Sequence, residues 1–373
     1  MEGLVAFLLV DTNATQFWSG RRVFLSGHTG FKGSWLSLWL QHLGAEVTGY
    51  ALDPPTDPSL FVKADVAACM HSVIGDVRDA AILASVMQAA QPAVVFHLAA
   101  QSLVRASYAD PVGTYETNVL GTLHLLEAVR KTPSVRAVVI ITTDKCYENK
   151  EWIWPYRETD PLGGYDPYSS SKACAEIVTA SWRDSFFNPA HYAEHKVAIA
   201  SARAGNVIGG GDWSTDRLIA DIVRAFSSGK TLEIRNPKAT RPWQHVLEPL
   251  RGYLTLAEKL CTGGVGYASA WNFGPQYTDA RPVEWIVRYL SSKWGSATQW
   301  ELDTAPQPHE AQMLKLDWSK AHGALGWQPC LELPEALDYT LDWYQRESAG
   351  ARARDLCLEQ IASYTDRTTS ITS

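Results

Sequence analysis

The sequence predicts an α/β fold in which a doubly wound parallel sheet of the Rossmann type is joined to a smaller, interleaved C-terminal lobe. Apolar, β-prone segments alternate with helical ones through the first half of the 373 residues, and a glycine-rich turn follows the first strand. The alternation is lost in the second half. We therefore expect a larger domain at 17–205, with segments near 240–275 returning to it, a smaller lobe at 206–350, and peripheral arms at 1–16 and 351–373.

The first strand, turn and helix run from Arg22 to Leu40 and predict a dinucleotide cradle. Residues 23–25 are apolar, as a parallel strand buried on both faces requires, and the apolar residues at 35–40 recur at helical spacing. The glycines of the turn lack the Cβ atoms that would keep a pyrophosphate away from the helix N-terminus. Their spacing is Gly-x-x-Gly-x-x-Gly, not Gly-x-Gly-x-x-Gly, and glycines can also simply punctuate a turn. The flanking strand and helix favour the cradle, whose residues are Gly27, Thr29, Gly30, Phe31, Lys32 and Gly33.

A second strand is expected at 46–52, and it ends in Asp53. An acid about twenty residues beyond the glycines can accept hydrogen bonds from the ribose of a bound adenosine, and Asp53 lies at that distance from Gly33. An acid directly before two prolines is also typical of a turn, so both interpretations of Asp53 stay open.

A third strand at 71–74 leads into Asp76 and Val77, where a bound adenine can be contacted. The carboxylate of Asp76 can accept a hydrogen bond from the adenine amino group. The alternative is that this acid begins the helix that follows, a position for which Asp79 is better placed.

A fourth strand is expected at 93–98, a helix at 110–130 and a fifth strand at 135–142. Two alanines after the fourth strand form a small-residue edge along which a dinucleotide can pass. The carboxyl ends of parallel strands meet at one edge of the sheet, where the ligands of such sheets bind. The residues expected at this edge are Leu98, Ala99, Ala100 and Thr142.

Tyr168 and Lys172 open a helix that runs to about residue 187 and precedes a sixth strand at 197–202. Side chains four residues apart share one face of a helix, so the ammonium can lower the pKa of the phenol and also reach a ribose hydroxyl. Tyr168 would then be a general base near neutral pH for a sugar hydroxyl. The alternative is an ordinary surface pair, which the preceding cofactor fold disfavours.

The second half has less regular elements. Arg217 and Arg241 are candidate ligands of a second diphosphate, because guanidinium groups match phosphate oxygens bidentately; solvated arginines are the alternative. The polar tail beyond Arg352 is expected to fray. The other expected elements are helices at 215–228, 281–292, 317–325 and 333–347 and a strand at 232–235.

The composition excludes some classes of protein. A net charge of −7 argues against a nucleic-acid surface, which needs an excess of Lys and Arg to neutralise phosphates. The six cysteines have no Cys-x-x-Cys pair and no metal-ligand spacing, so we expect reduced thiols in a cytoplasmic protein and no metal site. The apolar run at 3–10 is too short to span a bilayer and follows an acidic residue, so we expect neither a signal peptide nor a membrane anchor.

Several motifs together carry a resemblance to a known group of enzymes. Three of them are Gly27-His-Thr-Gly-Phe-Lys-Gly-Ser-Trp-Leu36, Thr142-Thr-Asp-Lys-Cys-Tyr147 and Arg241-Pro-Trp-Gln-His-Val246; two more are Tyr168-x-x-x-Lys172 and Arg203-x-Gly-Asn206. With the Ala99-Ala100 strand end, they resemble the nucleotide-sugar branch of the extended short-chain dehydrogenase/reductase superfamily over about residues 17–344. The superfamily implies an NAD(P)-linked sugar enzyme. The triplet Thr143-Asp144-Lys145 is similar to that of the 4,6-dehydratases, and most similar to that of the branch acting on CDP-glucose.

The resemblance implies a reaction and its residues. Tyr168, helped by Thr143 and Lys172, would take the proton of the glucose C4 hydroxyl while hydride passes to NAD. The C4 ketone makes the C5 proton acidic, and a base then removes that proton. Protonated Asp144 would give a proton to the departing C6 hydroxyl, and the hydride returns to C6, so NAD acts as a bound cofactor. The resemblance also implies CDP-glucose as substrate, Asn206 among its ligands, and a homodimer or homotetramer.

One position separates the branches of these dehydratases. Relatives that act on dTDP-glucose carry glutamate after the aspartate, and this chain has Lys145 there. A lysine can take the C5 proton only when it is neutral, which requires burial or a nearby cation. Whether Lys145 is the base or orients a water therefore stays open.

Two other functions remain to be distinguished. A nucleotide-sugar 4-epimerase or reductase would share the cofactor half, but would carry Ser or Thr followed by small or apolar residues where Asp144 and Lys145 stand. A non-enzymatic nucleotide sensor would not need the phenol of Tyr168. NAD and NADP also stay open, because Lys32 and Arg78 can meet a 2′-phosphate. No residue can be identified from the sequence as the one that reads cytosine over thymine.

Overall fold

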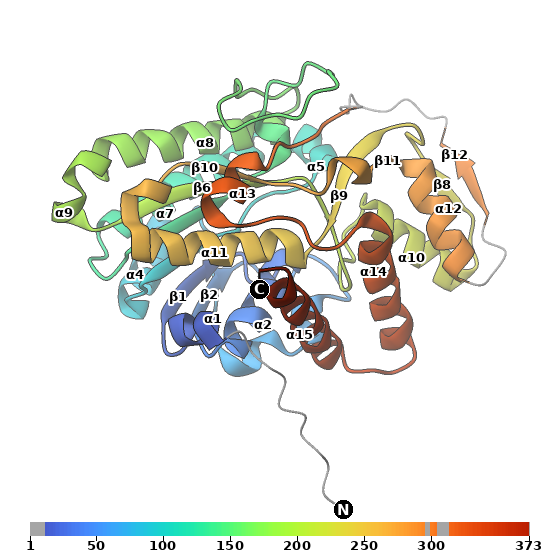
Figure 1. The fold of residues 1–373 in the computed structure, drawn as a ribbon, viewed down its shortest axis with the longest axis horizontal. Coiled ribbons are helices and arrows are strands. Elements are labelled where there is room, and N and C mark those ends of the chain that lie inside the picture. Colours follow the sequence, from blue (N-terminus) through green and yellow to red (C-terminus); the bar gives the residue numbers. More distant parts are fainter. Residues whose placement is uncertain (1–11, 295–298, 304–312, 373) are drawn as a thin grey trace, which may run out of the picture.

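The computed structural model describes residues 12–294, 299–303 and 313–372, and a seven-stranded sheet forms its centre (Figure 1). Neighbouring strands of this sheet are parallel, in the order β10-β6-β5-β4-β1-β2-β3. The chain winds outward from the middle in both directions, so the predicted doubly wound sheet is confirmed. The strands are β1 Arg22–Ser26, β2 Glu46–Ala51, β3 His71–Ile74, β4 Val94–His97, β5 Ala137–Ile141, β6 Ala198–Ala204 and β10 Ala270–Phe273.

An apolar layer covers each face of this sheet, because alternate residues of a strand point to opposite sides. Phe24 of β1 belongs to the layer formed with α4, α7 and α8. Its neighbours Val23 and Leu25 belong to the layer formed with α2 and α11. These five helices are α2 Phe31–His42, α4 Ala80–Ala90, α7 Gly121–Arg130, α8 Pro167–Phe186 and α11 Leu247–Gly263 (Figure 1).

The helix predicted at 110–130 is divided in the structure. After α5 Val104–Ala109, Asp110 caps α6 Pro111–Tyr115 by accepting a hydrogen bond from the backbone N–H of Gly113 at 2.9 Å. A π-helical turn at 116–120 then leads into α7. In this turn Asn118 donates a hydrogen bond to the hydroxyl of Ser171 at 2.8 Å. The turn thereby ties this helical segment to α8, which carries Tyr168 and Lys172.

Two small sheets stand beside the main one. The first contains β7, β9 and β11, and the second pairs β8 with β12 in parallel. Helices α10, α12 and α14 pack beside them, whereas α13 lies beside β10 of the main sheet (Figure 1). The bounds are β7 Asn206–Ile208, β8 Leu232–Ile234, β9 Thr240–His245, β11 Ala280–Pro282, β12 Trp300–Leu302, α10 Leu218–Ser228, α12 Val283–Trp294, α13 Ser319–Leu325 and α14 Leu333–Ser348.

Helix α11 is missing from the elements that the sequence predicted. Pro249 and Gly252 lie within it and hide its helical pattern, although proline is tolerated in the first turn of a helix. A Cβ at Gly252 would stand 2.4 Å from the ring of Phe273 in β10. Glycine at this position therefore lets α11 pack closely against the edge strand.

The expectation that the chain frays beyond Arg352 is wrong. Residues Ala353–Thr372 form helix α15, which packs against α2 and α14. Leu356, Ile361 and Tyr364 are buried on one face of it, and the hydroxyl of Tyr364 donates a hydrogen bond to Glu248 Oε2 at 2.6 Å. The tail looked polar because its other faces meet solvent, and an apolar stripe is sufficient to anchor a helix.

The remaining described elements are short. None of the described helices is long and apolar enough to cross a membrane. The apolar run at 3–10, on which the expectation of no leader or anchor rested, lies outside the described residues. The short elements are α1 Thr12–Trp18, α3 Leu60–Lys63, α9 Tyr192–His195 and 3-10 turns at Val66–Cys69, Asp144–Cys146, Pro189–His191, Gly264–Tyr267 and Tyr277–Asp279.

Candidate functional site

The three glycines after β1 differ in how much room the chain leaves for a side chain. Gly27 has a φ of +81°, and a Cβ there would stand 2.6 Å from the backbone nitrogen of Ala99. A Cβ at Gly33 would stand 2.0 Å from the carbonyl oxygen of Gly27. Both glycines therefore allow the turn to pack closely within the chain. A Cβ at Gly30 would meet nothing nearer than 3.5 Å, so packing within the chain does not require glycine there. Gly30 instead keeps open the space in front of α2.

The N-terminus of α2 can receive an anion. Gly30 precedes its first residue and supplies no side-chain cap, so the first N–H groups of the helix have no side-chain acceptor from that position. Lys32 lies in the first turn. The pKa of Lys32 is lowered to about 7, mainly by burial and also by the charges of Lys172 and Arg217, while the charge of Asp144 opposes them. The first turn of α2 therefore belongs to the same electrostatic environment as these three residues.

The loops after β1, β2 and β4 meet at the carboxyl edge of the sheet. The hydroxyl of Thr29 donates a hydrogen bond to the carbonyl of Leu52 at 2.8 Å, and the neighbouring Asp53 is exposed. The backbone N–H of Ala99 donates to the hydroxyl of Ser26 at 3.3 Å. The segment 98–100 and Asp53, both predicted to contact a cofactor, thus border the same turn.

The structure separates the roles of the two acids after β3. Asp76 accepts hydrogen bonds from Nε and Nη2 of Arg78 at 2.8 and 2.6 Å. Asp79 caps α4 by accepting the backbone N–H groups of its first turn, as the sequence predicted. Val77 is buried in the apolar layer beneath α4 and α7. The arginine that was considered for a 2′-phosphate therefore already faces a carboxylate.

Thr143 and Asp144 lie two and three residues after the end of β5 and are both buried. The hydroxyl of Thr143 donates to Asp144 Oδ1 at 2.9 Å, and its oxygen also accepts the backbone N–H of Lys145 at 3.3 Å. Burial raises the pKa of Asp144, against the lowering effects of Lys145, Thr143 and Arg241. Asp144 is 3% exposed, so its carboxyl group is held toward the protonated form.

Two segments from the second half of the chain meet Asp144. A Cβ at Gly205 would stand 3.1 Å from Asp144 Oδ2 and 2.7 Å from the ring of Pro242. This glycine directly precedes Asn206, and Pro242 directly follows Arg241, whose charge acts on Asp144. The predicted substrate ligands Asn206 and Arg241 thus flank the predicted acid.

Tyr168 lies in the first turn of α8 and is 8% exposed. Burial raises the pKa of its phenol to about 12, while the charge of Arg217 and hydrogen bonding with Thr143 act in the opposite direction. The predicted lowering of this pKa by Lys172 is not found, and the net shift is upward. Sequence spacing showed that the two side chains share a helix face, but it could not show how deeply the phenol is buried.

Lys172 is buried one turn after Tyr168. Its ammonium donates a hydrogen bond to the carbonyl oxygen of Ile141, the last residue of β5, at 3.2 Å. Burial lowers the pKa of Lys172 to about 8, and Glu176 raises it. The lysine is thus held between the end of β5 and a carboxylate one turn further along α8.

Arg217 is brought to the same place from before α10. Its Nη2 donates to the carbonyl oxygen of Ser102 at 3.3 Å, and its charge lowers the pKa of both Tyr168 and Lys32. The structure therefore gathers Lys32, Arg217 and Arg241 around the predicted catalytic residues.

A buried polar network beneath the site was missed. Glu176 accepts hydrogen bonds from Thr142 and Ser201, and it forms an ion pair with Arg203 at 2.8 Å. Arg203 in turn donates to the hydroxyl of Tyr147 at 2.8 Å. Two signals pointed to this network: a glutamate one turn after Lys172, and an arginine in a mostly apolar strand. Thr142, predicted to contact a cofactor, directs its hydroxyl to Glu176.

The network continues to the edge strand and beyond. The hydroxyl of Tyr147 donates to Asn272 Oδ1 at 2.7 Å, and Asn272 Nδ2 donates to the carbonyls of Tyr156 and Asp317 at 2.9 and 3.0 Å.

The described residues contain no group of three His, Cys, Asp or Glu side chains that could hold a metal ion.

Comparison with known proteins gives consistent matches over most of the chain. Residues 24–340 match the family model described as GDP-mannose 4,6 dehydratase. The chain is 53% identical over 364 residues to a CDP-glucose 4,6-dehydratase of Salmonella typhimurium, covering 97% of this chain and 100% of that protein.

Two solved structures share the fold. One is MoeE5 in complex with UDP-glucose and NAD, which has a TM-score of 0.74 and 23% identity and covers 88% of this chain and 99% of its own. The other is dTDP-glucose 4,6-dehydratase from Bacillus anthracis in complex with NAD, which has a TM-score of 0.71 and 20% identity and covers 89% of this chain and 98% of its own.

Proposed function

This chain belongs to the GDP-mannose 4,6 dehydratase family, and from its similarity to a CDP-glucose 4,6-dehydratase within that match we propose that it is an NAD-dependent CDP-glucose 4,6-dehydratase. It converts CDP-glucose to CDP-4-keto-6-deoxyglucose and water. The observation that carries the proposal is the buried Asp144, held toward its protonated form beside Lys145 and close to Tyr168. Beside the hydride acceptor, oxidation at C4 needs the tyrosine as its only acid–base group. Loss of the C6 hydroxyl needs a further acid and a further base.

The residues after β1 fit the cofactor. The open space in front of Gly30 and the N–H groups of α2 suit a pyrophosphate, and the amine of Lys32, which can donate hydrogen bonds, lies in the first turn. Asp53 and Asp76 lie two residues after β2 and β3, on the side expected for the adenosine half, and Lys172 is the residue proposed to hold the second ribose. When bound, NAD accepts a hydride from C4 and supplies it again to C6.

Tyr168 takes the proton from the C4 hydroxyl in the first half of the reaction. Its phenol must ionise to act as a base; the charge of Arg217 and hydrogen bonding with Thr143 partly offset burial, whose effect is larger, so the net pKa stays raised. C4 becomes a ketone, and the proton of the former C4 hydroxyl is then on Tyr168. Electron withdrawal by that ketone acidifies the proton on C5.

Asp144 and Lys145 divide the elimination between them. Lys145, or a water that it orients, removes the C5 proton, and Asp144 donates its proton to the C6 hydroxyl, which leaves as water. The C5 to C6 double bond then accepts the hydride at C6 and a proton at C5. Before the next turnover Tyr168 loses the proton that it took from the C4 hydroxyl and Asp144 regains one, so protons and electrons balance without an external oxidant or reductant.

Arg217, Arg241 and Asn206 are proposed to bind the substrate diphosphate and sugar. The guanidinium groups of Arg217 and Arg241 lie near Tyr168 and Asp144, respectively, as their electrostatic influence on these residues indicates. Phosphate oxygens bound there would leave the glucose ring between the base and the acid. A 4-epimerase would need no buried acid beside Tyr168, which disfavours that alternative.

We also propose that the enzyme is cytoplasmic and forms a homodimer or homotetramer. All six cysteines are free in the structure, in accordance with a reducing compartment. The proposed division into a cofactor domain at 17–205 and a substrate lobe at 206–350 follows from the same assignment.

The test is to incubate the protein with NAD and CDP-glucose. The expected product has lost one water, carries a 4-keto-6-deoxy sugar by NMR, and forms without net accumulation of NADH. Stoichiometric NADH would instead identify a simple dehydrogenase. A product that retains the C6 hydroxyl and has inverted C4 would identify an epimerase.

A further inference from the structure

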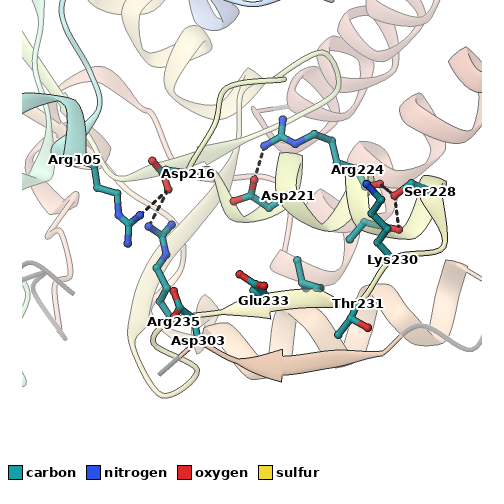
Figure 2. Close-up of a pocket in the computed structure, with 12 residues that line it drawn as sticks. Arg105, Asp216, Asp221, Arg224, Ser228, Lys230, Thr231, Glu233, Arg235 and Asp303 are labelled. Atoms are coloured by element: carbon teal, nitrogen blue, oxygen red, sulfur yellow. Dashed lines mark hydrogen bonds and ion pairs between the residues drawn. The ribbon is translucent and has the colours of Figure 1, made fainter. Parts of the chain in front are cut away.

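A polar pocket of about 590 Å³ lies between α10, β8 and α5. Figure 2 shows the charged side chains that line it, among them Arg105 and Asp216. Its volume is in the range of small-molecule sites, about 300–1,000 Å³. Two residues that line the pocket, Arg105 and Asp216, lie close in sequence to Ser102 and Arg217, which are hydrogen-bonded to each other. This position beside Arg217 indicates what the pocket can bind.

The pocket adjoins the catalytic residues through Arg217. This arginine follows Asp216, and it donates a hydrogen bond to Ser102, which lies just before the helix that carries Arg105. The same arginine acts on the pKa of Tyr168. A ligand whose sugar reaches Tyr168 and whose diphosphate reaches Arg217 would therefore extend its nucleoside toward the pocket.

Most of the carboxylates in the pocket are already paired. Asp216 Oδ1 lies 2.9 Å from Arg235 Nη1 and 3.6 Å from Arg105 Nη1, and Asp221 forms an ion pair with Arg224. Asp303 also has an interaction of its own. Glu233 differs from these carboxylates, because no described residue pairs with it.

Glu233 is directed into the pocket by the alternation of β8. It is exposed between Leu232 and Ile234, which are both buried, and Figure 2 shows its side chain on the pocket side of the strand. Arg235 lies two residues further on and lines the same pocket. The pocket thus presents a hydrogen-bond acceptor and a guanidinium donor from one strand.

We propose that this pocket binds the nucleobase of the substrate and that Glu233 is the residue that selects cytosine. Cytosine presents an amino group at C4, which a carboxylate accepts, and acceptors at N3 and O2, which a guanidinium can serve. Uracil and thymine present a carbonyl oxygen at C4, which an ionised carboxylate repels. With uracil or thymine bound, Glu233 would face another hydrogen-bond acceptor. Such a mismatch between polar groups discriminates strongly against the substrate that carries it. This inference rests on the proposed function.

The test compares CDP-glucose with UDP-glucose, since the two bases differ at C4 and at the adjacent N3. Glu233→Gln exchanges the carboxylate for an amide, which can donate to the O4 of uracil. We expect the ratio of kcat/KM for CDP-glucose over UDP-glucose to fall about tenfold or more, mainly through KM. Dehydration should still proceed once the variant is saturated with CDP-glucose.

Glu301→Gln is the matched control. Glu301 is the exposed register partner of Glu233 on β12 and does not line the pocket, so its substitution should leave the ratio unchanged. An unchanged ratio in Glu233→Gln, or an equal fall in both variants, would overturn the assignment of Glu233. A wild-type protein that turns over UDP-glucose and not CDP-glucose would overturn the proposed function itself. The two failures are therefore distinguishable.

Discussion

The carboxylate of Glu176 and the guanidinium of Arg203 form an ion pair at 2.8 Å in which both side chains are 3% exposed. Glu176 lies one turn after Lys172 on α8, and Arg203 lies in β6. Burial opposes the ionisation of Glu176, but Arg203 and hydrogen bonds from Ser201 and Thr142 outweigh it, and the net pKa is lowered. The ion pair therefore joins α8 to β6 beneath the candidate site.

Glu176→Gln should destabilise the fold by about 3–5 kcal/mol, because it leaves the buried guanidinium of Arg203 unpaired. Chemical denaturation measures this loss. Since the pKa of Glu176 is lowered, the stability that its charge contributes is present above about pH 4.5 and is lost as the pH falls through the lowered pKa. Glu127→Gln is the control, because its ion pair with Arg130 is partly exposed and should contribute less than about 1 kcal/mol. Equal losses in the two variants would contradict the role of the buried pair.

Gly30→Ala should leave the melting temperature close to that of the wild type while weakening NAD binding about tenfold or more. The new Cβ meets no atom of the chain nearer than 3.5 Å, but it projects into the space proposed for the pyrophosphate. Gly33→Ala is the contrasting variant and should lower the melting temperature, since its Cβ would stand 2.0 Å from a carbonyl oxygen. Thermal unfolding without cofactor and calorimetric titration with NAD measure the two effects. Normal NAD affinity in Gly30→Ala would place the pyrophosphate elsewhere.

Tyr168→Phe should bind CDP-glucose and NAD but lose about a hundredfold or more in turnover, because the ring remains and the proton acceptor is removed. Tyr165→Phe serves as control, since this tyrosine lies three residues earlier and is 77% exposed. Steady-state kinetics and substrate titration separate turnover from binding. Activity of Tyr168→Phe near that of the control would show that another group is the base.

Lys145→Ala should separate the two halves of the reaction. Tyr168, Thr143 and Lys172 remain, so hydride transfer from C4 should continue, while removal of the C5 proton should stall. In a single turnover, reduced nicotinamide should accumulate on the enzyme, and exchange of the C5 hydrogen with deuterated solvent should slow. The exposed Lys150, which pairs with Glu148, provides the control Lys150→Ala. If Lys145→Ala binds CDP-glucose poorly but exchanges the C5 hydrogen normally at saturation, Lys145 binds substrate and is not the base.

The pH dependence of stability should reveal the buried ammonium of Lys172. Its pKa is lowered from 10.5 to about 8 by burial, so between these values the unfolded chain binds more protons than the folded one. The free energy of unfolding of the wild type should therefore rise with pH across this window, relative to that of Lys172→Met, by roughly 1 to 3 kcal/mol. Denaturation of both proteins at pH values spanning about 7 to 10 measures the difference. A constant difference across the window would mean that Lys172 is not perturbed by burial.

Much of the fold could be predicted from the sequence by itself. The alternation of apolar strands and helices, the glycine turn at 27–33 and the shared face of Tyr168 and Lys172 are properties of short segments. Helical and strand periodicities act within such segments, so residue spacing is sufficient to recognise them. Among the elements that were missed or misjudged, α11 and α15 have patterns that are interpretable only with the surfaces against which they pack.

The tertiary structure alone decided the electrostatics of the site. Burial raises the pKa of Asp144 and Tyr168 and lowers that of Lys172, and burial depends on segments that are far apart in the chain. The contact between Glu176 and Arg203, and the position of Glu233 in a pocket beside Arg217, likewise join distant segments. Spacing along a chain describes which face of an element a side chain occupies. The charge that the side chain carries depends on the dielectric environment and the partners that folding brings to that face.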